Sequence, residues 1–318
     1  MSEIRSVFHL GEQSMQQRAG VRAQMEARGA QLIRPMLPQQ HRDFFAQLPL
    51  LFVGSIDATG QPWASVLAGP PGFVASPDPQ LLSVTTMLSE ADPLRTTLRD
   101  EAPLGLLGLE PHTRRRNRAN GTVIQHSPTG FSLRVKESFG NCPKYIQARE
   151  PTWRGNDGAP VSKAVLRLNQ LDFSMQQMVA RADTFFIASA FVEAGTADAH
   201  STSVDVSHRG GKPGFVRIDS PTQLTVPDFV GNNFFNTLGN LLQHPRAGLL
   251  FVDYERGDLL YVAAQAQVIE TGSDLDAFAG ARRLLQFQIT QAVLARAALP
   301  IAWGAASLSP VLAATGSW

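Results

Sequence analysis

The sequence predicts a mainly β protein with flanking helices, organised as two similar antiparallel barrels in tandem. Three observations support this prediction. Apolar runs of about six residues recur with turn signals between them, segments of the first half recur in the same order in the second half, and a polar stretch with Gly and Pro (residues 150–163) separates the two. We expect the first copy, with its N-terminal helices, at residues 1–160 and the second, with a C-terminal extension, at residues 161–318.

The internal repeat is the most informative feature of the chain. Gly105 begins the segment GLLGLE and Gly248 begins the matching segment GLLFVD. Four segment pairs match in the same order, namely residues 50–60 with 184–195, 65–66 with 203–204, 80–81 with 223–224, and 105–110 with 248–253. Four matches in one order are better than chance, and they indicate a duplication.

Each copy is predicted to contain the same elements, with one helix between its third and fourth strands. The first copy has an expected helix at residues 39–48, strands at 50–57, 63–69 and 79–86, a helix at 92–100, and strands at 104–110 and 120–126. The second has an expected helix at residues 172–182, strands at 184–191, 201–207, 214–218 and 223–226, a helix at 236–243, and strands at 247–254 and 259–269. Residues 274–285 and a strand-like segment at 287–295 follow.

Composition narrows the classes to which the chain can belong. Hydrophobic residues make up 43% and charged residues 17% of the 318 residues, which predicts a packed core. A formal net charge of +1 gives no global field to attract nucleic acid or an anionic membrane. The chain has one cysteine, no signal-peptide pattern and no long apolar run. We therefore expect a cytoplasmic protein with neither a membrane nor a nucleic-acid partner.

The first polar cluster is the segment HTRRRNRANG (residues 112–121) at the start of an expected strand. Side chains alternate along a strand, so Arg114, Arg116 and Arg118 are expected on one side, where their guanidinium groups could clamp a phosphate. A solvated turn or a small nucleic-acid patch is the alternative interpretation.

The second cluster runs from Asp205 through a Gly-rich turn to residue 215. Its glycines let backbone N–H groups approach an anion, and Ser207, His208 and Arg209 add side-chain donors. The alternative is a polar hairpin in which Arg209 pairs with Asp205.

The third cluster, residues 231–240, precedes and begins an expected helix. Asn233, Asn236 and Thr237 could cap that helix or bind an anion at its N-terminus, and the two roles are compatible. Histidine and cysteine spacing matches no metal-binding motif, so no metal site is expected.

These motifs resemble the pyridoxamine 5'-phosphate oxidase-like FMN-binding split-barrel family, and most closely a tandem subgroup of uncharacterised flavoproteins. The resemblance extends over nearly the whole chain. It rests on RRRNRANG (residues 114–121), FGNCPKYI (139–146), DVSHRGG (205–211) and NTLGN (236–240).

The resemblance implies a pseudo-dimer within one chain, with one FMN between the two copies. Ser203 stands near the position of a phosphate-binding Arg in the family and His208 near that of a Lys, while Arg209 could restore the lost charge. Asn236 and Thr237 occupy the helix start, and Arg116 aligns approximately with a flavin-holding Gln of the partner barrel. Arg118 or Lys212 could lie near the flavin N1 atom. The equivalent groove on the other side is expected to be degenerate, because residues 63–70 contain no basic residue.

Three functions follow as hypotheses. The first is an FMN-dependent oxidoreductase that passes electrons between a reduced nicotinamide (NADH or NADPH) or a similar donor and a small organic acceptor. The second is a non-catalytic flavin- or haem-binding sensor or carrier, and the third is a nucleic-acid or structural module that uses the arginine run. No catalytic acid or base is identified, and the pseudo-dimer could pair further into a homodimer.

Overall fold

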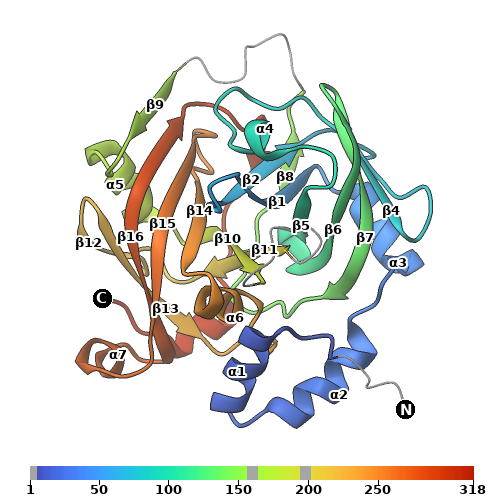
Figure 1. The fold of residues 1–318 in the computed structure, drawn as a ribbon. Helices are drawn as coiled ribbons and strands as arrows, with labels where there is room; N and C mark the ends of the chain where they lie inside the picture. Colours follow the sequence, from blue (N-terminus) through green and yellow to red (C-terminus); the bar gives the residue numbers. More distant parts are fainter. Residues whose placement is uncertain (1–5, 156–163, 194–201) are drawn as a thin grey trace.

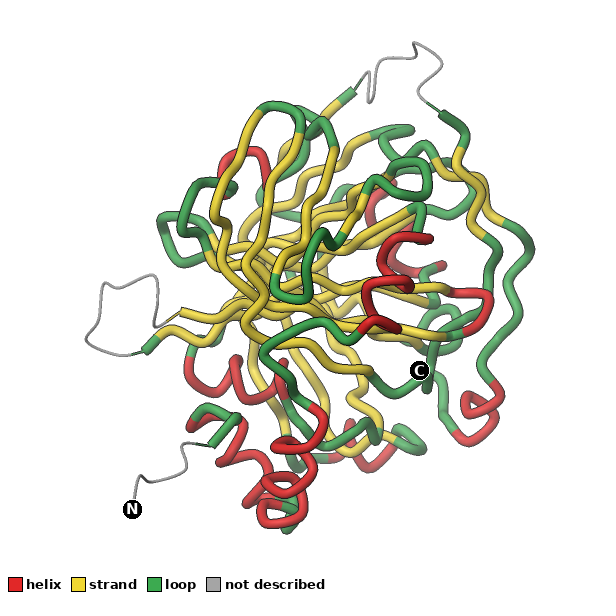
Figure 2. The backbone as a smooth tube through the Cα atoms, turned by 90° about the vertical axis from the view of Figure 1, so that its right-hand side faces the viewer, coloured by secondary structure: helices red, strands yellow, loops and turns green. Residues whose placement is uncertain are grey.

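The computed structural model describes residues 6–155, 164–193 and 202–318, and it is mainly β as the sequence predicts (Figure 1). The expected boundary between residues 160 and 161 and most of the expected linker lie outside the described residues. Figure 2 shows the strands crowded in the middle of the molecule and the helices around its outside. None of the described helices combines the length and the apolar character of a transmembrane span.

The first half begins with three helices and continues as a sheet. The helices are α1 (Leu10–Arg18), α2 (Arg22–Leu32) and α3 (Gln39–Gln47), with the short α4 (Leu94–Thr97) later in the chain. The strands are β1 (Leu50–Ile56), β2 (Pro62–Ala68), β3 (Val74–Ala75), β4 (Leu81–Thr85), β5 (Pro103–Glu110), β6 (Arg115–Ser127), β7 (Gly130–Gly140) and β8 (Pro151–Trp153).

The second half contains a similar succession. The helices are α5 (Phe173–Arg181), α6 (Asn236–Gln243) and α7 (Ser273–Ala277). The strands are β9 (Val165–Leu168), β10 (Thr184–Val192), β11 (Thr202–Gly210), β12 (Arg217–Ser220), β13 (Gln223–Phe229), β14 (Arg246–Val252), β15 (Leu259–Ile269), β16 (Ala281–Ala295) and β17 (Ile301–Trp303). Residues 281–285, for which no strand was predicted, begin the long strand β16.

The two halves have the same strand order. The first sheet runs β2-β1-β5-β6-β7-β4-β3 and the second runs β11-β10-β14-β15-β16-β13-β12, with β9 beside β16 and β17 pairing with β8. Every described pairing is antiparallel, as expected. Neither hydrogen-bonded ladder closes on itself, because β2 and β3 end one sheet and β11 and β12 end the other. The two predicted barrels are therefore observed as two open antiparallel sheets rather than closed ones.

The register of the ladders relates the halves residue by residue. With Gly105 matched to Gly248, the pairings match Phe52 to Phe186 and Ser65 to Ser207. A β-bulge interrupts both ladders at the same step, after Asn120 on β6 and after Ala263 on β15. Two of the sequence alignments shift accordingly. Residue 65 corresponds to 207 rather than 203, and residue 81 corresponds to 223 rather than 224.

The halves pack against each other through matched residues. The rings of Phe52 and Phe186 stack with their centroids 3.5 Å apart, in a core to which both halves contribute. A Cβ on Gly105 would lie 2.4 Å from the carbonyl oxygen of Val204, and a Cβ on Gly248 would lie 2.3 Å from that of Pro62. Such reciprocal contacts are what a two-fold axis between similar units produces. Glycine is required at both places because the backbones approach so closely.

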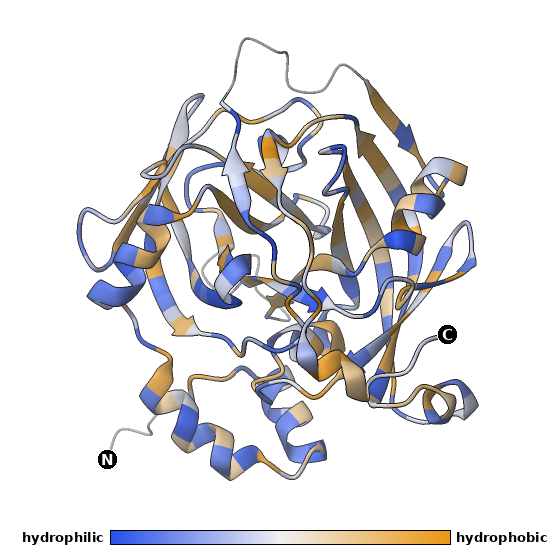
Figure 3. Ribbon diagram, turned by 180° about the vertical axis from the view of Figure 1, so that it is seen from behind, coloured by the Kyte–Doolittle hydropathy of each residue, from blue (hydrophilic) through white to orange (hydrophobic). Residues whose placement is uncertain are grey.

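Two further apolar cores lie one within each half. Phe44 and Phe45 of α3 belong to the core of the first half and Met15 of α1 to that of the second, whereas α2 contributes to neither. Figure 3 shows that hydrophobic residues concentrate on the strands, whereas the helices near the N-terminus carry many hydrophilic residues. Helix α1 crosses α6 where a Cβ on Gly11 would lie 2.1 Å from the carbonyl oxygen of Gly239. The α1 helix is thereby fixed next to the N-terminus of α6.

Candidate functional site

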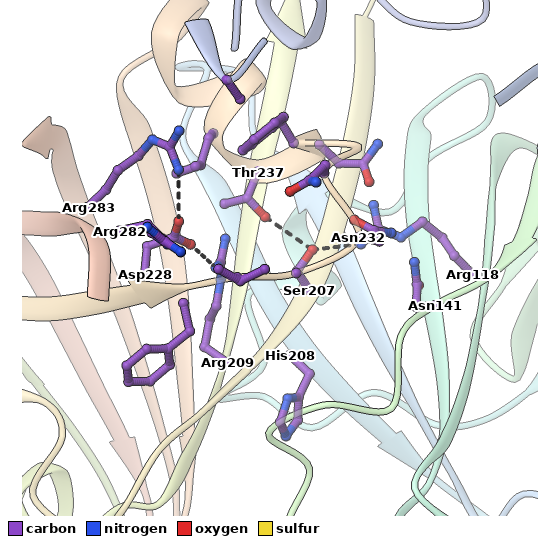
Figure 4. Close-up of a pocket in the computed structure, with 18 of the residues that line it drawn as sticks. Arg118, Asn141, Ser207, His208, Arg209, Asp228, Asn232, Thr237, Arg282 and Arg283 are labelled. Carbon is purple, nitrogen blue, oxygen red and sulfur yellow. Dashed lines mark hydrogen bonds and ion pairs between the residues drawn. The ribbon is translucent and has the colours of Figure 1, made fainter. Parts of the chain in front are cut away.

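A cleft of about 500 Å³ lies where the two halves meet (Figure 4). The first half lines it with Leu107, Arg116 and Arg118, and the loop after α1 adds Ala19 and Val21. Asn141 of the first half also lines it. The second half contributes Ser207, His208 and Arg209 on β11, residues 228–233 and 235–238, and the pair Arg282 and Arg283 on β16. The volume falls within the range of about 300–1,000 Å³ that is typical of small-molecule sites.

Alternate side chains of strand β11 form the floor of the cleft. Asp205, Ser207 and Arg209 are two residues apart and therefore share one face. His208 lies on the opposite face, where its ring meets the ring of Phe186 edge-on at 5.6 Å. In Figure 4 the His208 side chain accordingly points away from Ser207 and Thr237.

Arg118 and Asp205 form a buried ion pair between the halves. Arg118 Nη1 donates to Asp205 Oδ1 at 2.5 Å, and both side chains are nearly inaccessible to solvent. Arg118 Nη2 also donates to the carbonyl oxygen of Val206 at 3.0 Å. Asn120 and Asn240 each donate to the same carboxylate at 2.8 Å. Because four donors from both halves converge on Asp205 and its neighbours, this network fixes the position of β11 against β6.

The Ser207 hydroxyl lies at the edge of this hydrogen-bond network, and it donates its own hydrogen to no described residue. Its Oγ accepts from Arg118 Nη2 at 2.6 Å and from the Thr237 hydroxyl at 3.1 Å. Both oxygen lone pairs are thus used, so the Ser207 hydroxyl has only its hydrogen left to offer. Since Ser207 lines the cleft, that hydrogen is available to an acceptor bound there.

A second group of charges lies at the other end of the cleft. Arg209 pairs with Asp228, and Arg283 Nη1 lies 3.7 Å from the same carboxylate. The Arg283 guanidinium also lies over the ring of Phe235, 5.2 Å from its centroid. Arg282 beside it is exposed and has no partner among the described residues. Asp228 is the one acidic residue among the described lining residues. Glu270, outside the lining, lies 3.7 Å from Arg283 Nε, and Asp205 pairs with Arg118.

Arg116 adds a partly buried cation. Its Nε donates to the carbonyl oxygen of Cys142 at 2.7 Å and its Nη1 to that of His208 at 3.4 Å. Burial, with repulsion from Arg118 and Arg209, lowers the pKa of Arg116 to about 10. The guanidinium is still charged at neutral pH, and the repulsion would be relieved by an anion placed among the three arginines.

Several buried polar atoms of the cleft have no hydrogen-bond partner within the described chain. They are Nε of Arg118, Nε of Arg209, Nε of Arg283, Nδ1 of His208 and Oδ1 of Asn141. Leaving a buried donor unpaired costs about 1–3 kcal/mol. Nε of Arg283 still has the Glu270 carboxylate 3.7 Å away, whereas Nε of Arg118 and Nε of Arg209 have no such neighbour among the described residues. Unpaired guanidinium donors beside a cleft are expected of a site that accepts an anionic ligand.

Helix α6 begins beside the cleft without a side-chain cap. Its N-cap residue is Phe235, which has a left-handed backbone conformation with φ 64°. Asn233 shares that conformation with φ 63°. Asn236 and Thr237, expected as caps, are instead the first two helical residues, so the N–H groups of the first turn are left for a ligand. Bulky residues at positive φ are uncommon and concentrate at functional sites.

The N-terminal helix α1 supports this helix start. Asn236 Nδ2 donates to Glu12 at 2.5 Å, and His9 Nε2 lies 2.8 Å from Asn240 Oδ1. Burial, together with the nearby Asp205 and Glu137 carboxylates, raises the pKa of Glu12 well above its usual value. Asn236 therefore presents its backbone, rather than its amide side chain, to the cleft.

Eight of the ten predicted binding residues line the cleft. They are Arg116, Arg118, Ser207, His208, Arg209, Asn233, Asn236 and Thr237. Ser203 does not, because it is exposed nearer the other end of β11. Asp205 lies beneath the cleft wall as the partner of Arg118.

Three expected roles need correction. Arg114 precedes β6 in a left-handed conformation with φ 57°, so strand alternation does not extend to it, and its side chain donates to the carbonyl oxygen of Ile146. His208 lines the cleft but is not a cationic donor, because burial and the neighbouring Arg116, Arg209 and Arg149 lower its pKa well below the usual value. Lys212 donates to the carbonyl oxygen of Thr315, away from the cleft lining.

The sequence reasoning missed Asp228, Arg282 and Arg283. Asp228 pairs with Arg283 in the register of β13 and β16, 55 positions apart in the chain (228 to 283). The adjacent arginines were visible as a basic pair, but no local signal connects them to β11. Only the long-range strand pairing brings them to the site.

The groove related to this cleft by the matching of the halves is smaller and lacks basic residues. It has a volume of about 160 Å³. Val66 and Leu67 stand where the first cleft has His208 and Arg209, as the register shows. Leu259 and Tyr261 stand in the places of Arg116 and Arg118.

No protein-family model matches the sequence, and no curated protein matches it significantly. Similar solved structures include a protein provisionally assigned as a pyridoxamine 5'-phosphate oxidase from Lactobacillus delbrueckii, at 15% identity and a TM-score of 0.31, covering 40% of this chain and 97% of that one. HutZ, the haem storage protein of Vibrio cholerae, matches at 14% identity and a TM-score of 0.27, covering 40% and 95%. A FAD-binding protein of Mesorhizobium loti matches at 12% identity and a TM-score of 0.25, covering 41% and 96%. Each of these three similarities covers less than half of this chain.

Proposed function

We propose that this chain is a flavin-binding protein in which two tandem split barrels act as a pseudo-dimer and hold one FMN in the larger cleft. The observation that carries the proposal is the convergence of five arginines on a cleft between the halves whose described lining holds one carboxylate, Asp228. An anionic, planar ligand of the size of a flavin mononucleotide would offset this excess of positive charge.

The residues around the start of α6 would hold the phosphate. The first-turn N–H groups are uncapped, the Ser207 hydroxyl has a proton to donate, and Arg209 lies on the same face of β11. Arg116 approaches from the first half and keeps its Nη2 free of partners among the described residues. Guanidinium groups bind phosphate in a bidentate manner, so the chemistry of this donor set fits the group.

The protein's own contribution would be binding and electrostatics. The bound flavin would supply the electron-transfer chemistry, between a reduced nicotinamide or similar donor and a small organic acceptor. The arginines would favour the negative charge of a reduced flavin, and Ala19 and Val21 would shield one side of the cleft from water. Of the described lining residues, His208 alone carries an imidazole, and its pKa lies well below neutrality. Any proton that the reaction needs would therefore come from the substrate, the cofactor or water.

A haem- or flavin-binding carrier without catalysis is the second candidate. It is favoured because His208 carries the one imidazole among the described lining residues, and burial with the neighbouring arginines lowers the pKa of that imidazole well below its usual value. Haem ligation by His208 is disfavoured, because its ring is turned toward Phe186.

Titration of FMN by the quenching of its fluorescence tests the site. The double variant Arg116→Ala, Arg209→Ala should bind FMN far more weakly, since each charge-assisted phosphate contact contributes about 1.5–3 kcal/mol, or about 10- to 150-fold in affinity. Arg115→Ala is the matched control, because Arg115 lies on the same strand but packs over the ring of Phe44. Unchanged affinity in the double variant would refute the site.

Reduction under anaerobic conditions separates the two candidates. Bleaching of the flavin absorbance by NADH or NADPH is expected of the oxidoreductase. A flavin that binds but is reduced by neither NADH nor NADPH would favour the carrier function over the oxidoreductase.

A further inference from the structure

The smaller cleft, at the position in the other half that corresponds to the proposed flavin site, has the opposite electrostatic character. Its described lining contains no lysine or arginine, and its one charged residue is Asp92. At the positions matched to Arg116, Arg118 and Arg209 stand the uncharged residues Leu259, Tyr261 and Leu67. A phosphate would find no partner here, so this cleft is not a second copy of the first.

Asp92 is a buried carboxylate without a cationic partner. It is 5% exposed, and it accepts from the Ser65 hydroxyl at 2.5 Å and from the backbone N–H of Leu94 at 2.9 Å. The phenol of Tyr261, from the other half, is a further donor to it. Three neutral donors orient the carboxylate, but they leave its charge uncompensated at the wall of the cleft.

The rest of the lining is apolar and aromatic. Leu67, Leu88, Leu259 and Leu299 form much of the wall, and Trp153 adds an aromatic ring. A cavity of about 150 Å³ in another protein accommodates benzene, so 160 Å³ suits a body of one ring or a short branched chain.

We propose that this second cleft binds a small, largely apolar amine, whose ammonium group pairs with Asp92 while its hydrocarbon body fills the space between the leucines and Trp153. A protonated amine supplies the one charge that the site lacks, and an aromatic face stabilises a nearby cation. The chain would then bind an anionic ligand in one groove and a cationic one in the other. This inference is independent of the flavin, since no residue of the first cleft takes part.

Three small molecules of similar size but different charge test the proposal. 2-Phenylethylamine, 2-phenylethanol and phenylacetate are titrated separately into the full chain by calorimetry at about pH 8. At this pH the amine is protonated, and the pH lies above the pKa of about 6 to which burial raises Asp92. We expect the amine to bind more tightly than the alcohol by about 10-fold or more, the gain typical of a hydrogen bond to a charged group. Phenylacetate should not compete with the amine.

Variants assign the binding to Asp92. Asp92→Asn keeps the size of the side chain and should weaken amine binding by about 10-fold or more. Leu88→Trp fills the cleft without touching the hydrogen bonds of Asp92 and should abolish binding, which covers the case in which Asp92→Asn fails to fold. Asp276→Asn, an exposed carboxylate on α7, is the matched control and should bind like the wild type.

Three outcomes would overturn the proposal. They are no saturable binding of the amine by the folded wild-type chain, equal affinity for the amine and the alcohol, and amine affinity unchanged in both folded variants. None of them depends on whether FMN binds the larger cleft.

Discussion

Replacing Arg118 with methionine removes the cation that joins β6 to β11 and leaves the Asp205 carboxylate buried. The lost bonds are the ion pair at 2.5 Å and the donations to Val206 at 3.0 Å and Ser207 at 2.6 Å. Asn120 and Asn240 would still donate to Asp205, but neither neutralises it. Removing one partner of a buried ion pair typically costs about 3–5 kcal/mol.

Urea unfolding followed by circular dichroism measures this cost. With an m value of about 3 kcal/mol/M, a loss of about 4 kcal/mol lowers the midpoint by about 1.3 M. Arg115→Met, on the same strand, should lower it by about 0.3 M, since half-buried Arg115 donates one hydrogen bond, to the carbonyl oxygen of Gln40, and forms no ion pair among the described residues. The double variant Arg118→Met, Asp205→Asn should recover part of the loss, because no isolated charge then stays buried.

If Arg118→Met shifts the urea midpoint from the wild-type value no further than Arg115→Met does, this prediction is refuted. Such a result would mean that Asp205 is protonated or hydrated in the absence of the arginine. In that case the pair would not hold the two halves together, and the cleft would not depend on it.

Two further predictions concern stability. Burial, and next the Asp205 charge, raise the pKa of Glu137 to about 7, from an unfolded value of about 4.5. The folded state therefore holds a proton that the unfolded state has released, so the free energy of unfolding should fall as pH rises between these values. Glu137→Gln should flatten that part of the pH profile, and an unchanged slope in urea titrations would contradict the assignment. Gly105→Ala places a Cβ 2.4 Å from the Val204 carbonyl oxygen and should lower the melting temperature by several degrees, about 1–3 kcal/mol for overpacking. Gly72→Ala meets no atom but has a φ of 94°, so it controls for backbone strain alone, and equal losses in the two variants would refute the close approach.

The strands were predictable because their signals are local. Alternating or continuous apolar runs and turn residues mark β1, β5, β10 and β14, and the repeated GLL motif falls on matched strands. The association of residues 114–118 with residues 205–209 came from a family resemblance rather than from spacing. Arg118 and Ser207 do lie within hydrogen-bonding distance of each other.

What the sequence could not supply was the side of a strand and its long-range register. Ser207, His208 and Arg209 were read together as donors, yet alternation sends the histidine into the central core. Which of the two alternating sets of β11 side chains faces the cleft depends on how the first half packs against this strand. The same holds for Asp228 and Arg283, whose encounter is fixed by the register of β13 and β16.

The difference between the two clefts follows from joining the halves in one chain. In a dimer of identical subunits, each groove contains the same residues, so a change at one position alters both grooves. Here Arg118 and its counterpart Tyr261 are separate positions, as are Arg209 and Leu67. Each groove can therefore acquire its own charge at a small cost to the shared core around Phe52 and Phe186. The cations are confined to one groove and the uncompensated carboxylate to the other, and for this reason we expect one flavin, not two, for each chain.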